Sequence, residues 1–280
     1  MKNTKKIYTS NSMRAKGVAV WACMTEELWD SRELIWRLMV RDLSVRYRQS
    51  ILGYVWAVLP QIATVALFAY LSKHRVFDMG ETQLPYVIHA LWSISVWQLF
   101  STCLISCTNS LVNSGGLVTK VNFPKEALVV AAIGQAIFEF FIRIAPVMCV
   151  MLWYGFVPSW EAIFIPFILI FVILLALGVG FMLSIINLIF RDVGNAVNIT
   201  LTFGVFLSPV LYPPPLHEPF SFINIVNPFS PLLIATQNML LGYEFSYPGA
   251  ALGMVIFSIV MFLTGWRIFH ITMPRVTERV

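Results

Sequence analysis

The sequence predicts an all-α integral membrane protein with six transmembrane helices, and three observations support this fold class. Of its 280 residues, 58% are hydrophobic and 12% are charged, and the mean hydropathy is +0.77. This composition is too apolar for an ordinary soluble domain. Six apolar stretches have about the 20 residues that a helix needs to cross a bilayer. If the segments between these stretches alternate between the two sides of the membrane, nearly all basic residues lie on the same side.

Two segments precede the first apolar stretch. Residues 1–30 are polar and Lys-rich, and we expect a loosely ordered cytoplasmic extension to which we assign no role. Residues 31–49 have a helical period, because Arg37, Arg41 and Arg48 share one face at 100° per residue and apolar residues share the other. This pattern is typical of an amphipathic helix in the membrane interface, with its arginines toward lipid phosphates. Two pairs of opposite charge favour the same helix: Glu33 with Arg37, and Asp42 with Arg46.

Residues 31–280 are expected to form a single membrane domain, which includes the interfacial helix and all the spans. Its six spans are predicted at about 52–72, 85–108, 128–153, 161–187, 195–212 and 248–270. Ala176, Gly180 and Ser184 in the fourth span follow a small-xxx-small pattern, which favours close approach of another helix.

Two polar or proline-rich segments lie between the predicted spans. In Ser110–Ala127, a short helix or turn can begin at Asn113 and is stopped by Phe123-Pro124. The segment 212–247 is apolar but contains six prolines, so that no continuous spanning helix fits. We expect short re-entrant helices there, on the outer side between spans five and six, because irregular backbone at that depth must be covered by protein or line a cavity.

The distribution of Lys and Arg predicts the orientation of the chain. With a cytoplasmic N-terminus, only Lys73, Arg75 and Arg143 of the 19 basic residues fall outside cytoplasmic segments. Because cytoplasmic loops carry an excess of Lys and Arg, both termini are expected inside the cell. Arg191-Asp192, in the fourth loop, is expected to pair locally or to cap the fifth span.

No motif for covalent catalysis, metal binding or nucleotide binding occurs in the sequence. The patterns HExxH, GxSxG, DxD and GxxxxGK[ST] are absent, and the four histidines lack the spacing of metal ligands. The four cysteines have no further ligands nearby, which favours packing thiols at Cys23, Cys103, Cys107 and Cys149. We therefore expect no enzyme, no catalytic residue, no metal and no cofactor in this chain.

Two charged residues fall within the third predicted span. Glu139 and Arg143 are four residues apart, a spacing at which they can pair on one helix face. Charges in the membrane are costly and usually face the bundle interior or water. A structural ion pair is favoured, and a proton relay is the alternative.

Four motifs in order and in register carry a resemblance that extends from about residue 31 to the C-terminus. The first comprises Arg41-Asp42, Arg46–Ser50, Leu52-Gly53, Trp56 and Pro60, and the others are Gly116–Pro124, Phe190–Val193, and the pair Ser208–Pro213 and Asn227–Pro231. Together they resemble the membrane (permease) subunit of ABC-type polysaccharide exporters, which move lipid-linked O-antigen, teichoic acid or capsule chains. Residues 1–30 have no counterpart in this pattern.

The resemblance implies partners and a location. It implies a homodimer in the bacterial inner membrane with two copies of a separate ABC ATPase, which binds ATP and Mg. The substrate would be a lipid-pyrophosphate-linked glycan, with O-antigen favoured, and no nucleic acid partner is expected. A secondary transporter, or a channel working without an ATPase partner, is the alternative.

The resemblance also implies roles for particular residues. The pyrophosphate would meet basic residues beside the headgroup layer, and Arg pairs with phosphate bidentately; these residues are Arg37, Arg41, Arg46, Tyr47 and Arg48. The alternative role for these arginines is anchoring to anionic lipid. A coupling helix against the ATPase would involve Asn113, Ser114, Lys120 and Phe123.

Further residues are candidates for the glycan path. Aromatic rings stack on sugar faces, so that the candidates for the channel lining are Trp56, Phe68, Tyr70, Trp92, Trp97 and Phe100. A proline-rich outer gate would contain Tyr212, Pro213, Pro214 and Pro215.

Overall fold

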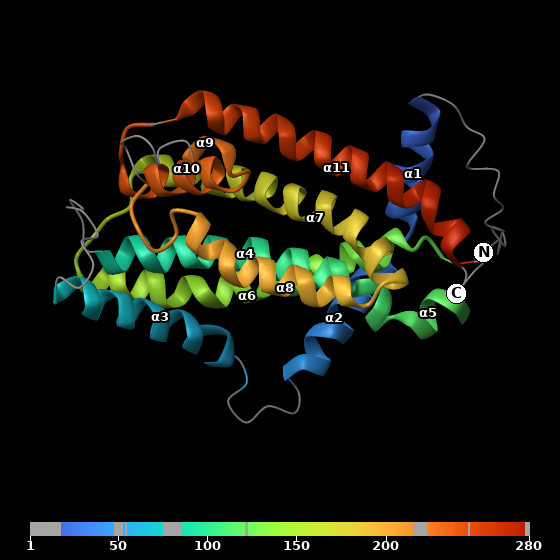
Figure 1. Ribbon diagram of the computed structural model, residues 1–280, viewed down its shortest axis with the longest axis horizontal. Helices are drawn as coiled ribbons and strands as arrows, with labels where there is room; N and C mark the ends of the chain where they lie inside the picture. Colours follow the sequence, from blue (N-terminus) through green and yellow to red (C-terminus); the bar gives the residue numbers. More distant parts are fainter. Residues whose placement is uncertain are drawn as a thin grey trace.

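The computed structural model describes residues 18–47, 53, 55–74, 86–120, 123–214, 223–245 and 247–277. All regular secondary structure in these ranges is helical, which confirms the predicted all-α class (Figure 1). The long helices run side by side along the longest axis of the molecule.

Within the described ranges, four helices are long and apolar enough to cross a membrane. They are α4 (Tyr86–Asn113), α6 (Glu126–Trp153), α7 (Ile165–Ile189), which is extended at its start by the 3-10 helix η2 (Trp160–Phe164), and α11 (Pro248–Thr277). α4 packs against both α6 and α7, and α11 packs against α7. α4 is the most buried of the four and α11 the least. The protein is therefore a multi-pass membrane protein with α4 at its centre.

Two shorter helices occupy the positions of the first and fifth predicted spans. They are α3 (Val55–Lys73), and α8 (Asp192–Gly204), which continues into the 3-10 helix η3 (Val205–Leu207). At 1.5 Å per residue, α8 and η3 together reach roughly 24 Å, which is shorter than the ~30 Å hydrocarbon layer. Four spans are thus supported by length and composition, and the count of six stays a prediction.

The N-terminal region is more ordered than we expected. Residues 18–30 form helix α1 (Val18–Asp30), in which Val20 and Met24 are buried. The ring of Trp21 lies edge-on to that of Trp266 in α11, with 6.0 Å between the ring centroids. The expectation of a loosely ordered segment is therefore wrong for these residues, because Trp21 and Met24 of α1 contact Trp266 and Arg267 of α11.

One face of helix α2 (Arg32–Tyr47) packs against α6, and another face is exposed. Leu38 is buried, and the Met39 side chain lies against Gly134, about two turns into α6. The predicted apolar face therefore contacts α6 rather than lipid tails alone. Val45, near the end of the same helix, is exposed.

The proline-rich region contains two short helices, as its prolines predicted. They are α9 (Ile223–Val226) and α10 (Ser230–Leu241), and α10 is buried along nearly its whole length against α7, α11 and α4. α10 ends at Gly242, whose φ of +73° is the left-handed conformation that glycine adopts freely. Re-entry of these helices into the bilayer stays a prediction.

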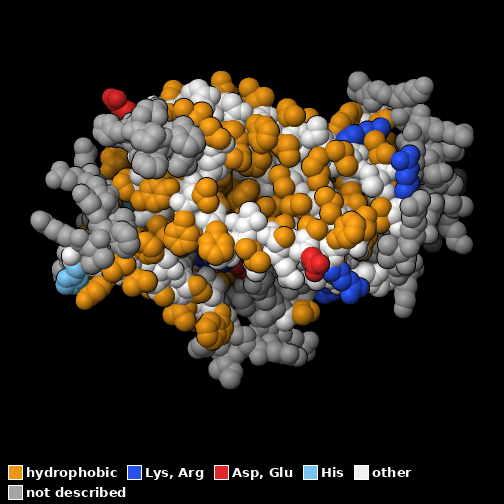
Figure 2. Space-filling model, in the orientation of Figure 1, with side chains coloured by type: hydrophobic (Ala, Val, Ile, Leu, Met, Phe, Trp, Pro, Cys, Tyr) orange, Lys and Arg blue, Asp and Glu red, His pale blue; other side chains and the backbone are white. Residues whose placement is uncertain are grey.

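The two ends of the bundle differ in charge. Helix α5 (Gly115–Lys120), α1 and the last turns of α11 lie at one end, and α9 and α10 lie at the other (Figure 1). Hydrophobic side chains cover the middle of the face in Figure 2, while basic side chains gather toward the end that carries α5. This polarity fits the predicted orientation with that end in the cytoplasm.

Candidate functional site

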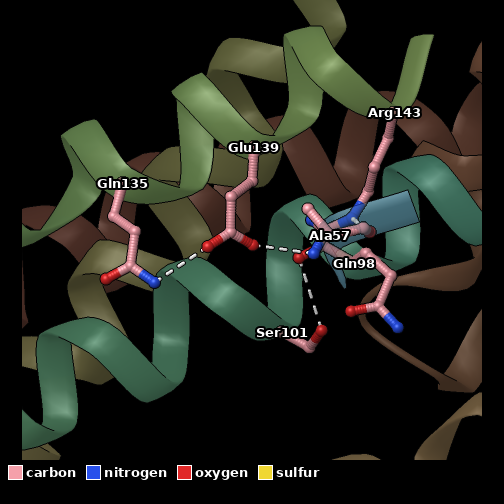
Figure 3. A network of polar contacts seen from close by, with 6 residues as sticks. All are labelled: Ala57, Gln98, Ser101, Gln135, Glu139 and Arg143. Carbon is pink, nitrogen blue, oxygen red and sulfur yellow. Dashed lines mark hydrogen bonds and ion pairs between the residues drawn. The ribbon is translucent and has the colours of Figure 1, made fainter. Parts of the chain in front are cut away.

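A buried charged network lies within the bundle, on α6 (Figure 3). Arg143 donates from a terminal guanidinium nitrogen to Oε2 of Glu139 at 2.7 Å, and Gln135 Nε2 donates to Oε1 of Glu139 at 3.0 Å. The Arg143 and Glu139 side chains are 8% and 3% exposed. The predicted ion pair within one helix is therefore confirmed, and it lies in the interior rather than toward lipid.

The same arginine connects α6 to α3. Arg143 Nε donates to the carbonyl oxygen of Ala57 at 3.2 Å. Pro60 lies within α3 and has no N–H, so that the carbonyl of Trp56, in the same turn, lacks its usual helical donor. One turn further along, Gln61 Nε2 donates to the Leu91 carbonyl at 3.2 Å and to Ser95 Oγ at 2.9 Å, both in α4.

These polar contacts join α3 to α4 and α6, against which it buries few side chains. Of its described side chains, only Gln61 and Val65 are buried. Interhelical hydrogen bonds stabilise helix association in a bilayer, where apolar surface alone provides little preference for protein over lipid. The position of α3 therefore depends on Arg143 and Gln61.

Two of the arginines expected near the pyrophosphate, Arg37 and Arg41, lie on the outward face of α2. Arg37 pairs with Glu33 at 2.6 Å, as predicted, and both side chains are 75% exposed. Arg41 pairs with its neighbour Asp42 at 2.7 Å. The pairing of Asp42 with Arg46 stays a prediction, since the Arg46 side chain is not among the described ones. The backbones of Arg46 and Tyr47 belong to α2, but their side chains and all of Arg48 lie outside the described residues.

The expected coupling segment contains a short helix, α5. Asn113 is the last residue of α4 rather than part of a loop, and Ser114 forms the turn between the two helices, where its carbonyl accepts the Leu117 N–H at 2.8 Å. Lys125 Nζ lies 4.1 Å from the centre of the Phe123 ring. Burial lowers the pKa of Lys125, and the neighbouring Glu126 carboxylate opposes that shift. The side chain of Lys120 lies outside the described residues.

The six aromatic residues chosen for a channel divide into two groups. Trp56 and Tyr70 on α3 are 57% and 61% exposed, and Phe68 is half-buried. The other three lie in the interior of the subunit: Trp92, whose indole donates to Thr236 Oγ1, and Trp97 and Phe100, which both contact the Phe229 ring. Of these six residues, only Trp56 and Tyr70 on α3 are exposed at the surface of the protein, where they can line a path that runs along its outside.

The expected outer gate, which begins at Tyr212, follows η3 after the non-helical residues 208–211. Tyr212 is half-buried and donates its hydroxyl to the Phe206 carbonyl at 3.2 Å. Its neighbour Leu211 accepts from the Tyr86 hydroxyl at 2.7 Å, which fixes this segment to the start of α4. Pro213 and Pro214 are half-buried, and Pro215 lies outside the described residues.

A polar stripe on α8 escaped the sequence analysis. At 100° per residue, Arg191, Asn195, Asn198 and Thr202 fall within about 60° of one another, and all four side chains are exposed. Their spacing of three and four residues is visible in the sequence, but the sequence analysis places Arg191 in the fourth loop and the other three residues in an apolar span. Arg191 makes no side-chain hydrogen bond as the N-cap of α8, while Asp192 lies in the first turn, where its charge complements the helix dipole.

The sequence profile of ABC-2 type transporters matches residues 33–242 of this chain, which extend from α2 to the end of α10. The chain belongs to the ABC-2 type transporter family. The resemblance that we drew from the four motifs is thereby confirmed at the level of the family. Helices α1 and α11 lie outside the matched range.

Individual relatives of this ABC-2 family member have names that describe export. The O-antigen export system permease protein RfbA of Myxococcus xanthus is 25% identical over 254 residues, which cover 88% of this chain and 95% of the relative. Two proteins of the same name from Klebsiella pneumoniae are 25% and 24% identical over 233 residues, which cover 82% of this chain and 88% of each relative. The similarity therefore extends over most of both chains.

Proposed function

We propose that this chain is the membrane subunit of an ATP-driven exporter that carries a lipid-pyrophosphate-linked polysaccharide, O-antigen in particular, from the cytoplasmic to the outer face of the bacterial inner membrane. It acts as a homodimer with two copies of a separate ABC ATPase, which binds ATP and Mg. The proposal is supported by membership of the ABC-2 family and by relatives that are named O-antigen export permeases.

The observation that best supports a glycan path is the exposed polar stripe of α8. Arg191, Asn195, Asn198 and Thr202 project from a helix of a membrane protein, and such groups are costly against lipid tails. A water-filled path between two copies of the chain accommodates them. The exposed Trp56 and Tyr70 of α3 supply aromatic faces on which sugars stack.

The pyrophosphate is received on the outward face of α2. Arg37 and Arg41 are held there by exposed acidic partners, Glu33 and Asp42. Exposed ion pairs contribute little stability, so that a diphosphate can replace the carboxylates at small cost. Arg46, Tyr47 and Arg48 continue the same basic segment.

The ATPase engages α5 and the adjoining residues. This helix lies at the end of the bundle toward which basic side chains gather (Figures 1 and 2). It is joined to α4 through one turn at Ser114. A short helix at the end of a long rigid one can convert movement at an interface into movement of the bundle.

Copurification with an ABC ATPase subunit from the same organism tests the proposal. We expect the two polypeptides to form a stable complex, ATP hydrolysis to require the ATPase, and loss of either gene to remove glycan from the cell surface. Export that continues without the ATPase would instead support the secondary transporter or channel.

A further inference from the structure

One buried asparagine joins three helices close to α5. Asn187 lies in the last turn of α7 and is 1% exposed. Its Nδ2 donates to the Thr108 carbonyl at 3.1 Å and to Asn109 Oδ1 at 3.0 Å, both in α4. Its Oδ1 accepts the Gly194 N–H of α8 at 2.8 Å. A single side-chain amide thus binds α4 and α8 to α7.

The close approach of α8 at this point requires a glycine. A Cβ atom on Gly194 would lie 2.7 Å from Asn109 Oδ1 and 3.2 Å from Asn187 Oδ1. Neither oxygen can withdraw without losing its hydrogen bond to the network. The first turn of α8 therefore lies close to α4 and is hydrogen-bonded to it through Asn187 of α7.

Elsewhere α8 is loosely attached to the subunit. Leu201 is its only buried side chain among the residues that the structure describes from 192 to 204. Its outward face carries the polar stripe that we assign to the glycan path. The orientation of this stripe thus depends strongly on the contacts at Asn187.

The hydrogen bonds of Asn187 connect α8 to the end of α4, and α4 leads directly to α5. Asn109 lies about one turn before the end of α4, and α5 follows after Ser114. A displacement of α5 by the ATPase therefore moves the last two turns of α4, where the Asn187 acceptors Thr108 and Asn109 lie.

We infer that Asn187 is a positioning residue that transmits movement of α5 to the channel-facing helix α8. The inference rests on the proposed function, since it requires an ATPase that acts on α5. It extends that function by identifying the contact through which a displacement of α5, driven by ATP hydrolysis, moves helix α8 beside the glycan path.

The test separates hydrolysis from export. Asn187→Leu keeps the side-chain size but removes all three hydrogen bonds, and Asn187→Asp keeps the acceptor for Gly194 but removes both donors to α4. Ser184→Ala is the matched control, because Ser184 is buried one turn earlier in α7 and bonds only to the Phe181 carbonyl of its own helix. Each full-length variant is purified with the ATPase subunit for hydrolysis, and surface glycan is measured on intact cells.

Both Asn187 variants are expected to form the complex and to hydrolyse ATP at close to the wild-type rate, while export falls by roughly tenfold, as is typical of the loss of coupling between sites. Ser184→Ala should leave both activities unchanged. Unchanged export in the Asn187 variants would overturn the inference, as would a parallel loss of hydrolysis and export, or failure of both variants to assemble. If the wild-type chain exports glycan without hydrolysis, the proposed function itself fails.

Discussion

At the scale of single residues, the Glu139–Arg143 pair illustrates how a membrane protein keeps charge in its interior. Gln135 and the Ala57 carbonyl supply further hydrogen bonds to the pair. Two charges removed from water stabilise a fold only when their geometry and remaining hydrogen bonds are favourable. The contact of Arg143 with α3 makes this pair part of the helix packing and favours the structural role over a proton relay.

Replacing Arg143 alone should destabilise the protein strongly. Arg143→Leu leaves the buried Glu139 carboxylate without its cation and should cost about 3–5 kcal/mol, as for other broken buried pairs. Thermal unfolding in detergent measures the effect. The double variant Glu139→Leu with Arg143→Leu should recover part of the loss, and Arg37→Leu, which breaks an exposed pair, should change Tm little. Equal Tm values for Arg143→Leu and Arg37→Leu would contradict this account.

At the scale of the elements, small residues set how closely the long helices approach. In α7, a Cβ atom on Gly180 would lie 2.5 Å from Cys107 Cβ of α4, so that the predicted packing role of the small-xxx-small pattern is confirmed. Gly178 lies on the other face of α7 and meets the backbone of α11 at Met261 and Gly265. Such contacts allow helix backbones to pack closely in a bilayer.

Two glycines of α11 allow a direct test of this packing. A Cβ atom on Gly265 would collide with the Gly178 carbonyl oxygen, whereas Gly253 has nothing within 4 Å of that position. Alanine favours a helix over glycine by about 1 kcal/mol at either site. Gly265→Ala should nevertheless destabilise the protein, since overpacking costs roughly 1–3 kcal/mol. Gly253→Ala should be neutral or stabilising in the same thermal unfolding assay, and a Gly265→Ala variant as stable as Gly253→Ala would refute the close crossing.

At the scale of the whole molecule, two surfaces face outward with different chemistry. The outer face of α11 is apolar, with Leu252 63% exposed, as suits contact with lipid. The outer face of α8 combines the polar stripe with apolar residues such as Ile199 and Phe203. We assign the first surface to the bilayer and the second to the path between two copies of the chain.

Cysteine labelling in membranes distinguishes these two surfaces. In a background with Cys23 and Cys149 changed to serine, Asn198→Cys should react with a hydrophilic maleimide, because water in the path permits the reactive thiolate. Leu252→Cys should react at least roughly tenfold more slowly, since a thiol in lipid stays protonated. Equal labelling of the two positions would argue against a water-filled path beside α8. Cys103 and Cys107 are buried in the core and serve as internal negative controls.

Sequence reasoning succeeded where the property is local. The predicted span over 128–153 became α6, and the i,i+4 spacing correctly paired Glu139 with Arg143. It failed for α1, although Trp21, Met24 and Leu28 have the three- and four-residue spacing of an apolar helix face. Two residues of this face, Trp21 and Met24, contact α11 at the opposite end of the chain, and the Lys-rich residues nearby concealed the pattern.

The sequence by itself determined an all-helical membrane protein with a basic end, because hydropathy, helix length and charge are properties of short segments. Only the tertiary structure decided that Trp92 and Trp97 are buried while Trp56 lies on the surface of the protein. It also decided that Asn187 joins α4 to α8. The physical reason is that burial and hydrogen-bond partners depend on which distant segments meet, and in a bilayer nearly every helix is apolar enough to meet several others.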